Sequence, residues 1–354
     1  MKRLPLLLLF LCPYFLSAQY NSNFNQEYFF GRLPSAKTEA LGGADVAIGG
    51  TVMSIFQNPA AIGSITNQQL DLSTGAPFFV LRESDYYFAG YAQRINDWLV
   101  AALSLNRFAI GQTTFEINLG TERYEVDNPR VNNVALTLAA EPIEGLQAGV
   151  NINLFNWKYI NDIGQARSLP IDLGAIYSLD AGPGKLSLGA SATSLIFGKI
   201  NFEDPLDNVY TQEFPRVLRI GGAYQGETEF EAGNFTHHLA YLVTIQYQNV
   251  LNNDYRGGLR LGLEGVLWRV LALRVGYFRL NEDDNGLPNE NFGFSRGPTY
   301  GFGLIIPLKL GDGFPDQMRV DYTSLPQPQL RRNSTRLPNS RTFSFQFIWT
   351  LPNS

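Results

Sequence analysis

Apolar and polar residues alternate along most of this chain, in segments of roughly nine to eleven residues separated by polar turns. Residues 146–154 (LQAGVNINL) show the alternation clearly, and residues 343–349 (FSFQFIW) show its last occurrence. Because successive side chains of a strand point to opposite faces of a sheet, this period predicts strands with one apolar face. About fourteen strands are predicted, at 69–75, 86–93, 98–108, 131–140, 146–159, 168–178, 185–194, 217–224, 239–248, 258–265, 269–279, 299–307, 318–324 and 341–349.

The connections between these predicted strands alternate in length. Counted from the first strand, most odd connections are long: 109–130, 195–216, 280–298 and 325–340. Most even connections are short: 94–97, 141–145, 179–184 and 266–268. The connections 225–238 and 308–317 are longer than this rule expects. Bacterial outer-membrane barrels have long extracellular loops, short periplasmic turns and an even number of strands. The sequence therefore predicts an all-β, transmembrane antiparallel barrel of about 14 strands.

The first residues have the order of a secretory signal peptide. Lys2 and Arg3 are followed by the apolar run 6–11 and by Leu16-Ser17-Ala18-Gln19, which predicts cleavage after Ala18. The only cysteine, Cys12, lies in the part removed. The mature chain would then have no disulfide, thiolate nucleophile or cysteine-ligated metal.

Composition changes this picture little. The formal charge of −5 does not favour nucleic acid as a partner. No later segment has eighteen consecutive apolar residues, so the sequence predicts no helical membrane span. A barrel is compatible with ordinary hydrophobic content, because only alternate strand residues face lipid.

Residues 19–66 lack the clear alternation of the rest. They contain the glycine pair Gly42-Gly43 and the turn-forming Asn58-Pro59, within a moderately apolar context. Such a segment needs a surface to pack against, and the lumen of the barrel is the natural one. We predict three parts: a signal peptide at 1–18, an N-terminal hatch or plug at 19–66, and an outer-membrane barrel at 67–354.

Several charged residues lie on the polar faces of the predicted strands. A charge facing lipid near the bilayer midplane would cost about 2–4 kcal/mol, so these side chains are expected to face the lumen. Arg260 and Glu264 share one face, as do Arg319 and Asp321. We expect both to pair across a packed interior, with a solute path as the alternative. The candidate lumen-facing charges are Asp172, Arg260, Glu264, Arg274, Arg319 and Asp321.

The sequence offers little for catalysis. Its only histidines, His237 and His238, fall in a predicted turn, and no G-x-S-x-G motif is present. We predict no catalytic residue, no metal site and no cofactor. The four tryptophans lie at or near predicted strand ends, which is typical of the aromatic girdles at membrane interfaces: Trp98, Trp157, Trp268 and Trp349.

The N-terminal motifs resemble those of a known superfamily. Gly42-Gly43-Ala44 followed by Asn58-Pro59-Ala60 resembles the signature of the FadL-like outer-membrane proteins. Later segments resemble its PorV/PorQ branch, which belongs to type IX secretion in Bacteroidota: 171–177, 186–191, 214–221, 271–277, and 319–322 followed by 341–345. The resemblance implies a fourteen-stranded barrel with an N-terminal hatch. The chain departs from the branch at Ser340-Arg341, where a histidine is usual, and in the residues that follow Trp349.

Two function classes follow from the resemblance. The first is a non-enzymatic component of type IX secretion, embedded in outer-membrane lipid, which handles secreted cargo or a partner translocon through its long loops. The second is a FadL-like transporter for a hydrophobic ligand such as a fatty acid, with exit sideways through the wall. A transporter needs an apolar pocket beneath the long loops, whereas an adaptor tolerates a filled lumen. A soluble periplasmic β-protein would carry charges on both strand faces, which this sequence does not.

Overall fold

The computed structural model describes most of the chain after residue 32. The described ranges are 33–75, 84–110, 115–119, 122–126, 130–158, 165–203, 209–232, 235–251, 257–280, 296–308, 313–325 and 339–350. The predicted signal peptide, and the parts of the predicted loops that fall between these ranges, lie outside the described residues.

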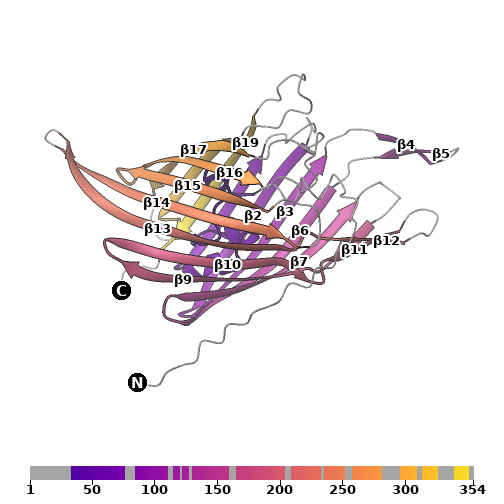
Figure 1. Ribbon diagram of the computed structural model, residues 1–354, viewed down its shortest axis with the longest axis horizontal. Coiled ribbons are helices and arrows are strands. Elements are labelled where there is room, and N and C mark those ends of the chain that lie inside the picture. The colour runs from indigo at the N-terminus through magenta and orange to yellow at the C-terminus, as the bar shows by residue number, and fades with distance from the viewer. Residues whose placement is uncertain are drawn as a thin grey trace.

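Within these ranges, fourteen strands form one closed antiparallel barrel (Figure 1). Each strand pairs with its neighbours in chain order, and the pairing of β1 with β19 closes the ring. All fourteen predicted strands are confirmed, with shifted ends. They are β1 (Gln68–Gly75), β2 (Ser84–Asn96), β3 (Leu99–Ile110), β6 (Arg130–Ile143), β7 (Leu146–Lys158), β9 (Ile171–Ala181), β10 (Gly184–Ile196), β13 (Val217–Ala232), β14 (Phe235–Val250), β15 (Gly258–Leu267), β16 (Leu271–Leu280), β17 (Arg296–Pro307), β18 (Gln317–Leu325) and β19 (Ser340–Trp349).

Five short strands lie at one end of the barrel. Two hairpins, β4 (Phe115–Leu119) with β5 (Glu122–Val126) and β11 (Lys199–Glu203) with β12 (Val209–Glu213), lie in long connections, and β8 (Gln165–Ser168) extends the sheet beside β7. We call this the long-loop end. The turns 97–98, 144–145, 182–183 and 268–270 lie at the opposite, short-turn end (Figure 1). The predicted sorting of connections by length is therefore confirmed.

One predicted connection is wrong. Residues 225–238 were expected to form a long link, but β13 continues to Ala232 and β14 begins at Phe235. The polar residues there keep the strand alternation, and they pair in register from Gly226 with Tyr241 to Ala232 with Phe235. Polarity is a poor guide to strand ends where a hairpin extends into water.

The two faces of the wall have inverted polarity. On β3, Leu103 and Leu105 are 60% and 46% exposed on the outside, whereas Ser104 and Asn106 are each 2% exposed on the inside. The same pattern of exposed apolar and buried polar residues recurs around the ring. A barrel surrounded by lipid requires this arrangement. No helix among the described residues is long and apolar enough to cross a membrane.

Residues 33–66 contact inward-facing residues around much of the barrel. The segment contains α2 (Ala36–Ala40) and two 3₁₀ helices, η1 (Val52–Phe56) and η2 (Pro59–Ser64). The residues that precede these helices are Ser35, Thr51 and Asn58. The side-chain oxygen of each caps its helix by accepting a hydrogen bond from a backbone N–H of the first turn, which has no other partner within the helix. Helix α2 packs against β16–β18, η1 against β1 and β2, and η2 against β6, β7 and β9.

Candidate functional site

The inner wall carries glycines where residues 33–66 approach it. A Cβ added at Gly262 would lie 2.7 Å from the Cβ of Leu41, and one at Gly301 would lie 2.8 Å from that of Ala40. Only glycine allows so close an approach between the segment and the strand backbone. Among the described residues, eight strands contribute one such position each. We call them the glycine track: Gly90, Gly149, Gly174, Gly189, Gly221, Gly262, Gly276 and Gly301.

The glycine pair ends helix α2. Gly42 and Gly43 have φ angles of +70° and +80°, a conformation that favours glycine. The N–H of Gly43 donates to the carbonyl of Thr38 at 2.8 Å, and the N–H of Gly42 donates to Thr299 Oγ1 on β17 at 3.0 Å. A Cβ at Gly42 would also lie 2.7 Å from the carbonyl oxygen of Tyr277. The pair therefore both turns the chain and brings it against the wall.

Asn58 joins the segment to itself and to the barrel. Its Nδ2 donates to the carbonyls of Val46 at 2.7 Å and Ala175 at 3.0 Å, while its Oδ1 accepts the N–H of Ala60 at 3.0 Å. The side chain is fully buried. Pro59 and Ala60 lie directly on Gly149 of the glycine track. The motif Asn58-Pro59-Ala60 is thus a contact between η2 and the wall.

Replacing Asn58 with Ala should destabilise the folded barrel by about 2 kcal/mol, because the change removes a helix cap and the hydrogen bonds to the carbonyls of Val46 and Ala175. The measurement is the temperature at which the compact, fast-migrating band converts to the unfolded band on a gel. Asn67→Ala is the control, because that exposed amide donates only to the carbonyl of Thr350 at 3.3 Å. Equal transition temperatures for the two variants would contradict the anchoring role.

A second anchor surrounds Asp45. The backbone N–H groups of Asp45 and Val46 both donate to Gln246 Oε1 at 2.9 Å. The Asp45 carboxylate accepts hydrogen bonds from the hydroxyls of Thr38, at 2.9 Å, and Ser54. Burial raises the pKa of Asp45 to about 6, although the two hydroxyl hydrogen bonds oppose this shift. Asp45 therefore connects α2 to η1 through its side chain. Gln246 of β14 binds the backbone of Asp45 and Val46, which lie between these two helices.

Five charged side chains meet between α2 and the wall. We call them the lumen charge cluster: Lys37, Glu264, Arg274, Arg319 and Asp321. Arg274 contacts Glu264 through Nε and Asp321 Oδ1 through Nη1 at 2.8 Å. Arg319 contacts the same two carboxylates at 3.0 and 3.1 Å, and Lys37 Nζ lies 3.2 Å from Glu264. Three cations thus surround two anions, and the side chains of Arg274, Asp321 and Glu264 are 0%, 1% and 7% exposed.

The expected pair of Arg260 with Glu264 is wrong, whereas Arg319 and Asp321 do lie together. Four residues along one strand span about 13 Å, too far for a direct pair. Glu264 instead faces Arg274, its partner across the β15–β16 ladder. Arg260 donates to the carbonyl of Gly42 at 2.9 Å and to Gln248 Oε1 at 3.2 Å. It holds the glycine pair rather than a carboxylate.

Asp172 lies apart from this cluster, in an amide network on β7 and β9. Its Oδ2 accepts from the side-chain amides of Asn151 at 3.0 Å and Asn153 at 2.8 Å. Its Oδ1 accepts the backbone N–H of Ser194 at 2.7 Å. Ser194 has φ +53° and lies in a bulge where the β9–β10 register shifts between Ala192 and Ile196. Asp172 therefore stabilises an irregularity in the wall.

Aromatic side chains fill the opposite part of the interior, toward the long-loop end. Phe56 meets Phe88 edge to face at 5.9 Å, and Phe155 lies 4.9 Å from Phe214 between ring centroids. We define the aromatic cluster as Tyr86, Phe88, Phe108, Phe155, Trp157 and Phe214, which pack with Val52, Met53 and Ile55 of η1. Trp157 is 2% exposed and points inward, so its predicted place in an outer girdle is wrong.

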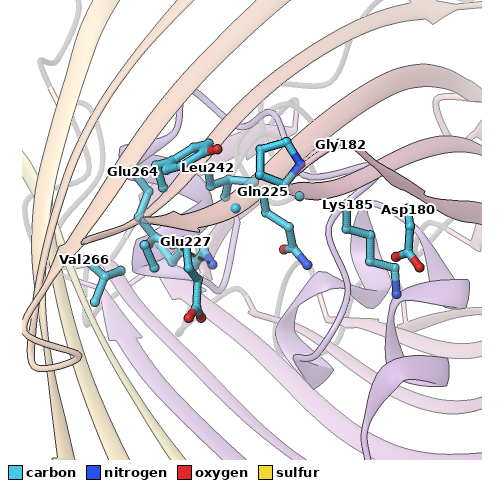
Figure 2. Close-up of a pocket in the computed structure, with 14 residues that line it drawn as sticks. Asp180, Gly182, Lys185, Gln225, Glu227, Leu242, Glu264 and Val266 are labelled. Atoms are coloured by element: carbon cyan, nitrogen blue, oxygen red, sulfur yellow. Dashed lines mark ion pairs between the residues drawn. The ribbon is translucent and has the colours of Figure 1, made fainter. Parts of the chain in front are cut away.

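A cavity of about 640 Å³, which we call the vestibule, lies at the short-turn end (Figure 2). Its lining is largely polar and charged, including Lys37, Asp180, Lys185, Gln225, Glu227 and Glu264. In Figure 2, Asp180 and Lys185 lie on one side, and Glu227 and Glu264 on the other. Such a lining suits water or charged groups better than a hydrophobic ligand.

His237 and His238 lie on β14, not in a turn as expected, and His238 Nε2 is 2.9 Å from Glu227 Oε2. Among the described residues, no group of three or more His, Cys, Asp or Glu side chains could hold a metal ion. The interior of the barrel therefore contains residues 33–66, the lumen charge cluster, the aromatic cluster and the vestibule.

The barrel resembles solved structures of bacterial channels. The toluene transporter TodX of P. putida has a TM-score of 0.52 and 13% sequence identity, over 91% of this chain and 100% of that chain. The monoaromatic hydrocarbon channel CymD gives 0.48 and 11%, over 89% and 97%. A FadL homologue of Pseudomonas aeruginosa gives 0.43 and 11%, over 88% and 97%. No protein-family model and no curated protein matches the chain. At such low identity, these similarities establish the fold alone.

Proposed function

We propose that this chain, which has the fold of the FadL-type hydrocarbon channels, lies in the bacterial outer membrane and passes small hydrophobic molecules. Toluene transport is the activity of TodX, and this chain shares the fold of TodX. In this proposal residues 1–18 are a signal peptide cleaved after Ala18, residues 19–66 are the hatch, and the long loops face outward.

The aromatic cluster is the observation that carries this proposal. It places a hydrophobic surface in the interior, toward the long-loop end, next to η1 of the proposed hatch. Apolar groups such as toluene or an acyl chain gain about 25 cal/mol for each Å² that leaves water. Phe108, Phe155 and Trp157 are closely packed against η1, so a ligand that enters between the long loops would gain this free energy when η1 moves aside and exposes them.

The vestibule argues against straight passage to the short-turn end. A hydrophobic ligand that crossed it would pass charged side chains such as Lys185 and Glu227, and would be exposed to water. The bilayer outside the wall offers a lower free energy. The bulge beside Ser194, held by Asp172, is the irregular part of the wall near the aromatic cluster. We infer that a ligand leaves sideways there, while the hatch around Asn58-Pro59 adjusts.

Secretion is the second candidate, and the filled interior is the observation that favours it. The aromatic cluster occupies one part of the interior, and the lumen charge cluster with α2 occupies another. An adaptor that binds a partner translocon or secreted cargo through its loops needs no open lumen. The comparisons support the channel reading better, because TodX, whose fold this chain shares, is a toluene transporter.

Deletion of the gene, followed by two assays in the same strain, separates these functions. We expect uptake of labelled toluene or oleate to fall several-fold and to return when the intact gene is restored. Proteins secreted through the type IX route, measured by mass spectrometry of the medium, should keep their amounts. Normal uptake together with reduced cargo secretion would reject the channel proposal in favour of the adaptor.

A further inference from the structure

The hairpin of β13 and β14 extends beyond the rest of the barrel (Figure 1). Each strand has 16 residues, whereas about 9–11 are enough to cross a bilayer. Pairing of β13 with β10 stops at Gly226, and pairing of β14 with β15 stops at Leu239. Residues 227–232 and 235–238 therefore pair only with each other among the described strands. We call these residues the free ribbon.

The two faces of the free ribbon differ in chemistry. On β13, Glu227, Glu229 and Glu231 continue the row that faces the lumen, because they are an even number of residues from the inward-facing Arg219. Phe230 on β13 and Phe235 on β14 belong to the opposite face and are 43% and 72% exposed. The ribbon thus carries an acidic face, next to the vestibule, and an aromatic face.

In the free ribbon, the backbone edge of β13 that faces away from β14 pairs with no other described strand. On β14, the carbonyl of His238 accepts the N–H of Trp268 at 2.9 Å, so that edge is partly used. Glu227 lies 2.9 Å from His238 and 3.8 Å from Arg269. Within the described ranges, Glu229 and Glu231 have no ion pair, and every residue from Glu227 to Glu231 is exposed. A two-stranded ribbon is marginal in water, and an exposed strand edge readily accepts another strand.

We propose that the free edge of β13 binds an extended segment of a partner protein in which basic and apolar residues alternate. A strand added to an edge directs successive side chains to opposite faces of the sheet. Its basic residues would lie beside Glu229 and Glu231, and its apolar residues beside Phe230. Opposite charges and aromatic–aliphatic pairs on neighbouring strands both stabilise a sheet. The partner approaches from the short-turn side, and its binding requires nothing to pass through the barrel.

A binding assay on the full-length barrel in detergent tests this proposal. The probe is a short fluorescent peptide in which Lys and Val alternate, and fluorescence anisotropy reports its binding. The double variant Glu229→Lys/Glu231→Lys should weaken binding by about tenfold or more, because two attractive pairs become repulsive. Asp97→Lys/Glu144→Lys makes the same charge change at two other short turns and should leave the affinity unchanged. Phe230→Ser should weaken binding without a change in charge.

Two further peptides distinguish strand addition from simple attraction between charges. A peptide of the same composition with its Lys and Val residues in separate blocks keeps the charge but loses the alternation. A peptide with alternate backbone amides methylated keeps the side chains but cannot donate to the edge of β13. We expect both to bind at least about tenfold more weakly than the alternating peptide. The proposal would be overturned if the block or the methylated peptide bound as tightly as the alternating peptide, or if the alternating peptide did not bind. It would also be overturned if the two double charge-reversed variants changed the affinity equally.

Discussion

Replacing Arg274 with Met is expected to lower the stability of the folded barrel by about 2–3 kcal/mol, because two buried carboxylates lose the cation that is least exposed to water. The side chain of Arg274 is 0% exposed and contacts both Glu264 and Asp321. Arg319 would still contact both carboxylates and Lys37 would still contact Glu264, but their side chains are 14% and 19% exposed, so they should compensate for the loss of Arg274 only in part. The measurement is the midpoint temperature of the compact-to-unfolded conversion on a gel.

Two variants control this result. Arg269→Met removes an arginine whose side chain is 73% exposed and lies 3.8 Å from Glu227, and we expect a change below about 1 kcal/mol. The double variant Arg274→Met/Asp321→Asn also removes the charge of Asp321, which is 1% exposed and would keep only its contact with Arg319, so part of the loss should be recovered. If Arg274→Met unfolded at the same temperature as Arg269→Met, the lumen charge cluster would not stabilise the barrel.

Replacing Gly189 with Val should displace residues 33–66 from the wall and open the lumen to small polar solutes. A Cβ at Gly189 would collide with the backbone of Val46 and Ala47, which cannot rotate away as a side chain can. The fourteen-strand ladder does not depend on this contact, so the barrel should still migrate as a compact band. Swelling of liposomes in a sugar solution measures the opening, and we expect a clearly faster rate than that of the intact protein.

Gly222→Val is the matched control, because Gly222 lies on the outer face with its nearest atoms 3.6 Å away. It should leave liposome swelling unchanged. Gln246→Ala gives a second route if Gly189→Val does not fold, since the change removes the acceptor for the N–H groups of Asp45 and Val46. A folded variant of either kind that swells no faster than the intact protein would show that this segment does not close the lumen.

The alternation of residues was enough to predict the strands and their inner faces. Leu103 and Ser104 illustrate why, because a strand in lipid must show apolar atoms outward whatever its neighbours are. Strand ends were harder to predict. Thr228, Glu229 and Phe230 alternate as a strand does, yet their polarity resembles a turn, and pairing with β14 decides in favour of the strand.

The sequence by itself determined a fourteen-stranded barrel, the inner and outer faces of its clearly alternating strands, and the sorting of its connections, because these depend on a local period of two residues and on the surrounding lipid. Only the tertiary structure decided which lumen residues meet. Glu264 pairs with Arg274 rather than Arg260, because the register of neighbouring strands brings distant residues closer than a spacing of four along one strand can. The glycine track is also a tertiary feature. Gly189 and Gly276 are ordinary strand glycines in the sequence, and they become necessary where the backbone of residues 33–66 lies against them.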